Sequence, residues 1–287
     1  FDGVICSDWG IINVRHWGVD SLSIEERYVK AIDAGIDQFG GEKDTKIVIE
    51  LLEKNIISIS RIDDSVRRIL KNKFSLGLFD NPYVEVDLVK DRVNTDRNIK
   101  LGQEAQKKSM VLLKNDSILP LKKNLNIFLD GFKTKDLSYG NVVNNIESAD
   151  VIVSYLHTVF NGNQPSGIDR LVDNVLSTIF PNQDLNFNPE IINKLDSFAK
   201  EKPTIVIVDL NRPAILNRIN EISSGLLATF GVDEEVIFEI LFGYHAPNGK
   251  LPFEIPSSMD EVRNQFEDVP DDTKNPTFRA GFGLTYK

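Results

Sequence analysis

The chain has 287 residues and a formal net charge of −10 at pH 7, with 41% hydrophobic and 26% charged residues. This composition is typical of globular proteins with one large domain or two ordinary ones, and the acidic balance argues against nucleic acid as a partner, because phosphate binding requires clustered Lys and Arg. No apolar run approaches the roughly 18–20 residues that cross a bilayer, so we expect no membrane partner.

The cysteine and histidine content argues against several kinds of site. Cys6 is the only cysteine, so no internal disulfide can form, and His16, His157 and His245 stand far apart in no metal-ligand spacing. We therefore expect no metal site. Phe1 opens directly on an apolar stretch, without an initiator Met or a signal peptide. From this we expect that preceding chain and any targeting signal have been lost, which leaves the compartment undecided.

The first 80 residues predict the element order β-α-β-α-α, which is typical of parallel α/β folds. Strands are expected where short apolar runs end in polar or glycine residues. Helices are expected where apolar residues recur with helical spacing after a capping side chain such as Ser23 or Ser60. The predicted strands are residues 3–8 and 35–39, and the predicted helices are residues 24–34, 44–57 and 60–77.

A connector at residues 80–97 separates this part from a second series of elements. There, β-branched runs alternate with amphipathic helices, which predicts a doubly wound, mostly parallel open sheet. Residues 161–188, rich in Asn, Asp, Gly and Pro, predict a long loop with a helical turn near residues 171–179. Strands are predicted at residues 111–113, 126–129, 150–156, 204–209 and 226–230, and helices at residues 98–110, 189–200, 212–220 and 233–242.

Asp8 lies where parallel α/β enzymes place reactive groups, just beyond the carboxyl end of a predicted strand. Trp9 follows it. An indole ring offers an apolar platform for the face of a pyranose, and a carboxylate can attack or stabilise a cationic anomeric carbon. An aspartate after a strand is also a common turn former or helix cap. The residues alone leave both roles open.

The stretch from Phe1 to Gly10 (FDGVICSDWG) resembles the GFDGxxxSDW motif of glycoside hydrolase family 3, whose aspartate is the nucleophile. Further motifs follow in the family's order, so that the resemblance covers nearly the whole chain. They are Ala34 to Asp37 (AGxDM), Arg61 to Phe79 (RIDxxVRRIL…LGLF), Ser109 to Leu121 (SxVLLKNxxxLPL), and the C-terminal signature at residues 241–252 and 281–286. The chain is thus similar to the C-terminal part of a family 3 enzyme.

The resemblance implies the last two β/α units of a (β/α)8-type barrel in residues 1–80, a linker in residues 81–97 and an α/β sandwich in residues 98–287. Asp8 would follow the seventh barrel strand, and residues 35–39 would form the eighth. Two strands cannot close a barrel. We therefore expect the missing N-terminal barrel segment to be supplied in cis by a longer natural chain or in trans by another chain, a homodimer included.

The implied function is that of a retaining glycoside hydrolase that releases non-reducing-end β-linked glucose or xylose, with no cofactor. A glycosyl-enzyme would form on Asp8 while a second carboxyl protonates the leaving oxygen and later activates water. The family's usual acid/base glutamate has no match here. Asp169 is a partial match, Glu234 and Glu235 lie in another aligned loop, and a residue in the missing part is a further candidate. The acid/base stays open.

Trp9, Arg15, His16 and Gln38 are the candidates for substrate binding, Trp9 as the wall of a subsite and Gln38 at the end of the eighth strand. Barrel-rim packing is the alternative for Trp9, and solvated loop positions are the alternative for Arg15 and His16. Other polar residues are expected to be structural, namely Asp37, His157 and His245, and Arg61, Arg67 and Arg68 are expected to form a solvated helix face with local salt bridges.

The alternative function is a non-catalytic fragment or scaffold that binds carbohydrate, or that needs the missing barrel for activity. A dehydrogenase-like protein is disfavoured, because the sequence has no Gly-rich strand-to-helix turn. Covalent labelling of Asp8 by a slowly turned-over glycoside distinguishes a catalytic protein from a scaffold.

Overall fold

The computed structural model describes residues 1–13, 18–134, 137, 139–158, 184–266 and 268–286. The chain divides into two compact units, Phe1–Val89 and Lys90–Lys287. This division falls inside the predicted linker at residues 81–97. The predicted helical turn at residues 171–179 lies outside the described residues.

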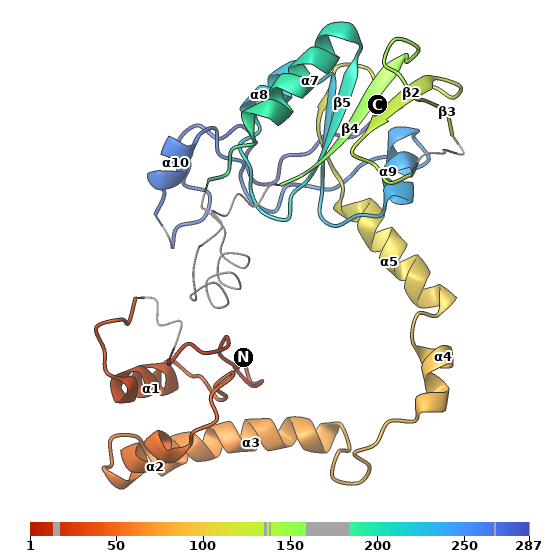
Figure 1. Cartoon of the computed structure of the whole chain (residues 1–287). Coiled ribbons are helices and arrows are strands. Elements are labelled where there is room, and N and C mark those ends of the chain that lie inside the picture. Colours follow the sequence, from red (N-terminus) through yellow and green to blue (C-terminus); the bar gives the residue numbers. More distant parts are fainter. Residues whose placement is uncertain (14–17, 135–136, 138, 159–183, 267, 287) are drawn as a thin grey trace, which may run out of the picture. The chain divides into compact units, whose positions relative to one another are not determined.

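Three helices organise the first unit: α1 (Ile24–Asp33), α2 (Lys46–Glu53) and α3 (Ile59–Ser75) (Figure 1). α1 begins with a complete capping box, in which Ser23 Oγ accepts a hydrogen bond from Glu26 N–H and the Glu26 carboxylate accepts one from Ser23 N–H. The apolar faces meet in a small core, which consists of Ile12, Tyr28, Ile32, Leu51 and Ile57.

The start of α3 corrects one prediction. The sequence predicted Ser60 as the cap of this helix, but Ser58 holds that position, because its Oγ accepts a hydrogen bond from Arg61 N–H at 3.2 Å. Ser58 has the extended backbone of an N-cap residue, with ψ 145°, whereas Ser60 already belongs to the helix.

The two predicted strands of this unit are reduced to a single parallel bridge between Cys6 and Gln38. The backbone N–H groups of Asp37 and Gln38 both donate to Ile5 O, and Ser7 N–H donates to Gln38 O at 2.9 Å. In the described part of this unit each segment has only the other as a β partner, so the ladder ends after a few hydrogen bonds. The pair nevertheless runs parallel, as expected for a β-α-β unit.

The chain between α3 and the sheet of the second unit carries η1 (Val86–Leu88), α4 (Val89–Arg92) and α5 (Asp96–Ser109). α5 begins after Thr95, whose Oγ1 accepts a hydrogen bond from Asn98 N–H. It leads directly into the sheet of the second unit.

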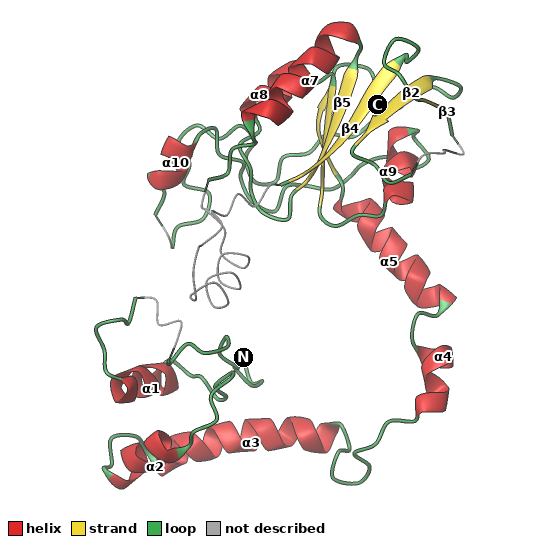
Figure 2. Cartoon of the chain, in the orientation of Figure 1, coloured by secondary structure: helices red, strands yellow, loops and turns green. Residues whose placement is uncertain are grey.

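A six-stranded, mostly parallel sheet forms the centre of the second unit (Figure 2). The strand order is β1-β6-β5-β4-β2-β3, with β1 antiparallel to β6 and the other pairs parallel. The chain runs one way from β2 to β3 and the opposite way from β4 to β6, so the predicted doubly wound sheet is confirmed. The strands are β1 (Val111–Asn115), β2 (Asn126–Asp130), β3 (Asn141–Val143), β4 (Val151–His157), β5 (Thr204–Asp209) and β6 (Gly225–Thr229).

Helices cover both faces of this sheet (Figure 1). α7 (Pro189–Glu201) and α8 (Asn217–Ile222) pack on one face, and α9 (Glu234–Leu241) packs on the other. Successive residues of β4 point to opposite faces, so that Ile152 joins the core under α7 and Val153 joins the core under α9. Both faces are therefore apolar, which explains the uninterrupted hydrophobic runs of the central strands.

Three elements of this unit differ from the predictions. β3 has only three residues and was not predicted. The helix predicted at residues 212–220 begins only at Asn217, and the backbone before it is bonded to another segment, with Ile215 N–H donating to Leu185 O. α10 (Met259–Arg263) was also missed, although Ser258 caps it by accepting a hydrogen bond from Glu261 N–H.

Candidate functional site

Asp8 lies at the carboxyl end of the parallel pair in the first unit, two residues beyond the Cys6–Gln38 bridge. The preceding residue, Ser7, is buried and held from two sides. Its N–H donates to Gln38 O at 2.9 Å, and its Oγ accepts a hydrogen bond from Gly40 N–H at 2.9 Å. The chain therefore reaches Asp8 in a fixed position.

The Asp8 carboxylate is exposed and bonded to the turn that carries it. Its Oδ1 accepts a hydrogen bond from Trp9 N–H at 2.7 Å, and the Asp8 carbonyl accepts one from Ser7 Oγ at 2.8 Å. Gly10 N–H, on the far side of the turn, donates to Gly40 O at 3.0 Å. The turn is thus tied down on both sides, while the residue Asp8 is exposed.

The indole of Trp9 lies against two glycines and is 64% exposed. A Cβ atom on Gly40 would lie 2.6 Å from Trp9 Cε3 and 2.8 Å from Ser7 O, and one on Gly41 would lie 2.7 Å from Trp9 Cδ1. Only residues without a side chain leave room for the ring there. Gly41 also has φ +76°, a backbone conformation that favours glycine.

Gln38 is exposed and takes part in the site through its backbone, which forms the bridge to Cys6. Arg15 and His16, the two other predicted binding residues, lie outside the described residues. Arg27 was missed by the sequence analysis. Its guanidinium binds backbone carbonyls of the segment after Asp8. Because Arg27 stands within a predicted helix, the sequence gave no indication of these contacts.

Asp37, expected to be structural, is the centre of a buried ionic network, and its side chain is 0% exposed. It accepts hydrogen bonds from Ile5 N–H at 3.0 Å, Ser65 Oγ at 2.7 Å, Arg68 Nη1 at 3.1 Å and Arg61 Nη1 at 3.4 Å. Burial by itself would raise the pKa of Asp37. The hydrogen bonds from Ile5, Ser65 and Arg68 and the charge of Arg68 outweigh burial and hold the pKa below its ordinary value.

This network corrects the prediction of a solvated arginine face. Arg61 donates to Asp37 and also to the carbonyls of Ile32 and Ile36, and Arg68 pairs with Asp37. Only Arg67 behaves as predicted: it is largely exposed and pairs locally with Asp64.

Glu234, an acid/base candidate from the sequence, is tied to the backbone of a neighbouring loop in the second unit. Its carboxylate accepts hydrogen bonds from Lys133 N–H at 2.8 Å and Thr134 N–H at 2.9 Å. Burial would raise the pKa of Glu234, but the hydrogen bonds from Thr134 and Lys133 lower it below its ordinary value. Glu235 is exposed in the first turn of α9, and Asp169 lies outside the described residues.

The two described histidines pair with carboxylates. His157 Nδ1 lies 3.3 Å from Asp209 Oδ2, and His245 Nε2 lies 3.4 Å from Glu239 Oε2. Asp209 is buried, and its other oxygen accepts hydrogen bonds from Thr229 Oγ1 and Gly231 N–H. Both pairs are compatible with the structural roles expected for these histidines. Within the described residues no three His, Cys, Asp or Glu side chains are grouped as metal ligands.

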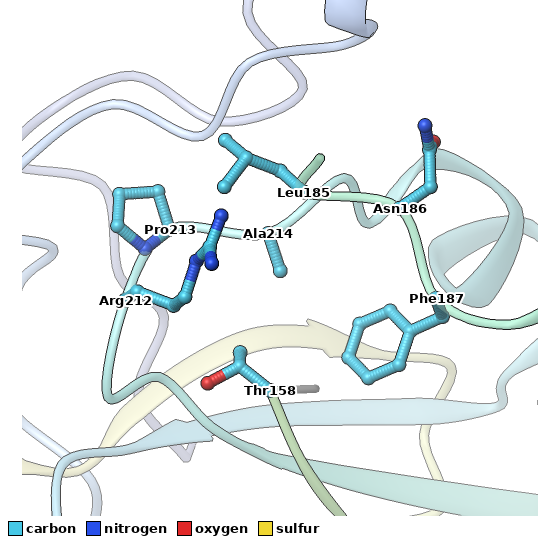
Figure 3. A pocket seen from close by; sticks show the side chains of 7 residues that line it. All are labelled: Thr158, Leu185, Asn186, Phe187, Arg212, Pro213 and Ala214. Atoms are coloured by element: carbon cyan, nitrogen blue, oxygen red, sulfur yellow. The ribbon is translucent and has the colours of Figure 1, made fainter. Parts of the chain in front are cut away.

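A small pocket lies beside the carboxyl ends of β4 and β5 (Figure 3). Thr158, Asn186 and Arg212 supply polar groups to its wall, and Phe187 closes one side. Thr158 Oγ1 is buried without a hydrogen-bond partner among the described residues. The cavity volume of about 10 Å³ suits one water molecule and is too small for a sugar ring.

Of the described helices, none has the length and apolar character that a membrane span requires.

Comparison with known proteins places these features in a family. The model of the glycosyl hydrolase family 3 C-terminal domain matches residues 138–286. The chain is 37% identical over 302 residues to a probable beta-glucosidase C of Aspergillus oryzae and 36% identical over 307 residues to a periplasmic beta-glucosidase/beta-xylosidase of Dickeya chrysanthemi. Each match covers 100% of this chain and 46% of the relative. The chain thus spans about half the length of these curated relatives.

The crystal structure of a beta-glucosidase from Listeria innocua in complex with isofagomine resembles the fold with a TM-score of 0.71 and 22% identity. This similarity covers 100% of the present chain and 48% of the Listeria chain. The family match and the relatives in sequence agree with the ordered motifs that surround Asp8, and the chain belongs to glycoside hydrolase family 3.

Proposed function

We propose that this chain carries the nucleophile of a retaining β-glycosidase, and that Asp8 forms the glycosyl-enzyme during release of non-reducing-end glucose or xylose. The observation that carries this proposal is the exposed Asp8 carboxylate on a turn fixed from both sides. The names of the sequence relatives, beta-glucosidase and beta-xylosidase, supply the class of substrate.

In the proposed reaction, a carboxylate oxygen of Asp8 attacks the anomeric carbon while the bond to the leaving oxygen breaks. The fixed turn favours this step, because an oriented nucleophile avoids the entropic cost of finding its geometry in the transition state. The exposed ring of Trp9 next to Asp8 is suited to pack against the apolar face of the sugar. Two carboxyl groups and a water suffice for this chemistry, so the proposal requires no cofactor.

The proton donor of the first step is unassigned. The bonds from Lys133 and Thr134 to Glu234 favour a structural role for that carboxylate. Glu235, Asp169 and a residue of the expected N-terminal barrel segment stay as candidates. For retention, the donor carboxyl must come within about 5–5.5 Å of Asp8 in the working enzyme.

We further propose that additional chain completes the barrel around Asp8, either in cis or from another copy. The relatives are about twice as long as this chain. Large apolar side chains on and after α3 are also exposed, among them Ile59, Phe74 and Leu76. An exposed apolar surface of this kind is typical of a surface that another part of the protein covers.

The test is to incubate the whole protein with an activated 2-fluoro-β-glucoside and, in parallel, with the corresponding 2-fluoro-xyloside, and to map the adduct by peptide mass spectrometry. We expect a single adduct on the peptide containing Asp8, and none in an Asp8→Asn variant. An adduct on another carboxylate, or none with either sugar, contradicts the assignment. Sugar binding without any adduct would favour the scaffold function.

A further inference from the structure

The side chain of Arg27 joins two separate parts of the segment that follows Asp8. Its Nη1 donates to Ile12 O at 2.9 Å, its Nε to Val19 O at 3.2 Å and its Nη2 to Asp20 O at 3.1 Å. All three guanidinium nitrogens are therefore used on backbone carbonyls. A planar guanidinium with donors in a fixed fork is suited to hold several carbonyls at once, whereas a lysine ammonium is not.

Arg27 is itself held by a well-anchored helix. α1 begins at the Ser23 capping box, and Arg27 N–H donates to Ser23 O at 3.0 Å. The neighbouring side chain, Tyr28, is buried and packs edge-on against Phe39, with ring centroids 4.8 Å apart. Phe39 directly precedes Gly40 and Gly41, the glycines against which Trp9 lies. α1 therefore contacts both the segment after Asp8, through Arg27, and the segment that supports Trp9, through Tyr28.

The contact at Ile12 connects Arg27 to the turn. Ile12 is four residues beyond Asp8, and its side chain is buried in the core of the first unit. Between them, Gly10 N–H is bonded to Gly40 O. Removing the guanidinium leaves the carbonyls of Ile12, Val19 and Asp20 without these donors, and the segment loses its fixed attachment to α1.

We infer that Arg27 is a positioning residue for the Asp8 site: by binding the carbonyls of Ile12, Val19 and Asp20, it sets the place of the segment that borders the nucleophile. This inference rests on the proposed function of Asp8. Arg27 touches neither substrate nor the reacting atoms, so it acts through the backbone it holds. Its loss lowers the rate at which Asp8 reacts in folded protein.

The experiment compares Arg27→Ala and Arg27→Lys in the whole protein with wild type and with Arg67→Ala as the matched control. Arg67 is exposed, and among the described residues its side chain pairs with Asp64. The measurements are kcat and KM for a nitrophenyl β-glucoside and the rate of Asp8 labelling by the 2-fluoro-glucoside. The unfolding curve of each variant gives its folded fraction, and kcat and the labelling rate are expressed per folded molecule. Guanidinium chloride at low, non-denaturing concentration is added to each variant.

We expect Arg27→Ala to lower the labelling rate and kcat/KM by up to about 100-fold, as for a displacement of the nucleophile by about 1 Å. Arg27→Lys keeps the charge but lacks the fork, so it should be impaired as well. Free guanidinium should partly restore Arg27→Ala and not Arg27→Lys. Arg67→Ala should behave like wild type.

Two results overturn the inference. In the first, Arg27→Ala labels Asp8 as fast as wild type does. In the second, the unfolded fraction of Arg27→Ala accounts for its whole loss of labelling rate, and guanidinium does not restore that rate. Failure of the proposed function has a different signature, since wild type itself then acquires no adduct on Asp8. Should Arg27→Ala not fold, Arg27→Lys is compared with wild type instead. Two measurements then decide together: hydrogen exchange of residues 10–13 and 18–22, and the labelling rate.

Discussion

Asp37 Oδ2 accepts a hydrogen bond from the backbone N–H of Ile5 at 3.0 Å, so a fully buried carboxylate holds the strand segment that leads to Asp8. The same carboxylate is bound by Ser65 and Arg68 from α3. One side chain thus connects a helix, the segment after α1 and the segment before the proposed nucleophile. The site depends on an ionic group that lies outside it.

Replacing Asp37 by Asn should destabilise the first unit by about 3 kcal/mol, because Arg61 and Arg68 would face a neutral amide. Both arginines partly reach solvent, which places the loss at the low end of the range for buried pairs. Denaturant unfolding measures the change. Asp64→Asn is the control, since it removes the exposed pair with Arg67 and should cost less than about 0.5 kcal/mol. Equal losses in the two variants would refute a central role for Asp37.

The stability that Asp37 provides should depend on pH in one direction. The pKa of this carboxyl is lowered in the folded protein, against about 3.9 in an unfolded chain. Its stabilisation is therefore present above the unfolded value and is lost as the pH falls through the folded value. The difference in unfolding free energy between wild type and Asp37→Asn should stay constant near neutral pH and shrink only below about pH 4. A difference that grows on acidification would show the opposite shift.

The glycine under Trp9 gives a prediction with a matched control. Gly41→Ala introduces a Cβ that meets Trp9 Cδ1 at 2.7 Å and also requires a positive φ, whereas Gly77→Ala requires a positive φ of 68° with nothing within 4 Å. Both should lose about 1–2 kcal/mol from the backbone conformation. Only Gly41→Ala should also slow Asp8 labelling by 2-fluoro-glucoside, because Trp9 must move. Equal labelling rates in both variants would show that the ring position is unimportant.

Much of the fold was readable from local pattern. The strand Thr204–Asp209 begins with five buried β-branched residues, and it was predicted with its observed bounds. The cap of α1 at Ser23 was also predicted, because the capping residue stands next to the helix it caps. Where two serines compete, as at Ser58 and Ser60, local pattern was insufficient, since only the backbone conformation decides which hydroxyl reaches the free N–H groups.

The contacts that shape the site could not be predicted, because they join residues far apart in the chain. Asp37 meets Arg68 across 31 positions. Helical spacing places Arg61, Ser65 and Arg68 on one face of α3, but it does not reveal that Asp37 lies against that face. The support of Trp9 by Gly40 and Gly41 has the same origin, as does the contact of Arg27 with Ile12. The position of Asp8 after a strand was local information. Its supports became visible only in three dimensions.

Glu234 offers the sharpest test of the acid/base assignment. Its carboxylate accepts two backbone N–H groups, from Lys133 and Thr134, and Glu234→Gln leaves a single acceptor oxygen for both. If its role is structural, this variant should lose about 1–3 kcal/mol of stability, with turnover per folded molecule unchanged. Glu235→Gln, at an exposed position in the same helical turn, should change stability by less than about 0.5 kcal/mol.

The competing role makes the opposite prediction for the same variant. An acid/base residue contributes about 10²- to 10⁴-fold, so its removal should slow hydrolysis of glucosides with poor leaving groups far more than of activated ones. Azide should then restore turnover by attacking the glycosyl-enzyme in place of the activated water. Because a backbone-holding carboxylate predicts neither the dependence on the leaving group nor rescue by azide, the two measurements on Glu234→Gln separate the roles even if the variant is also less stable.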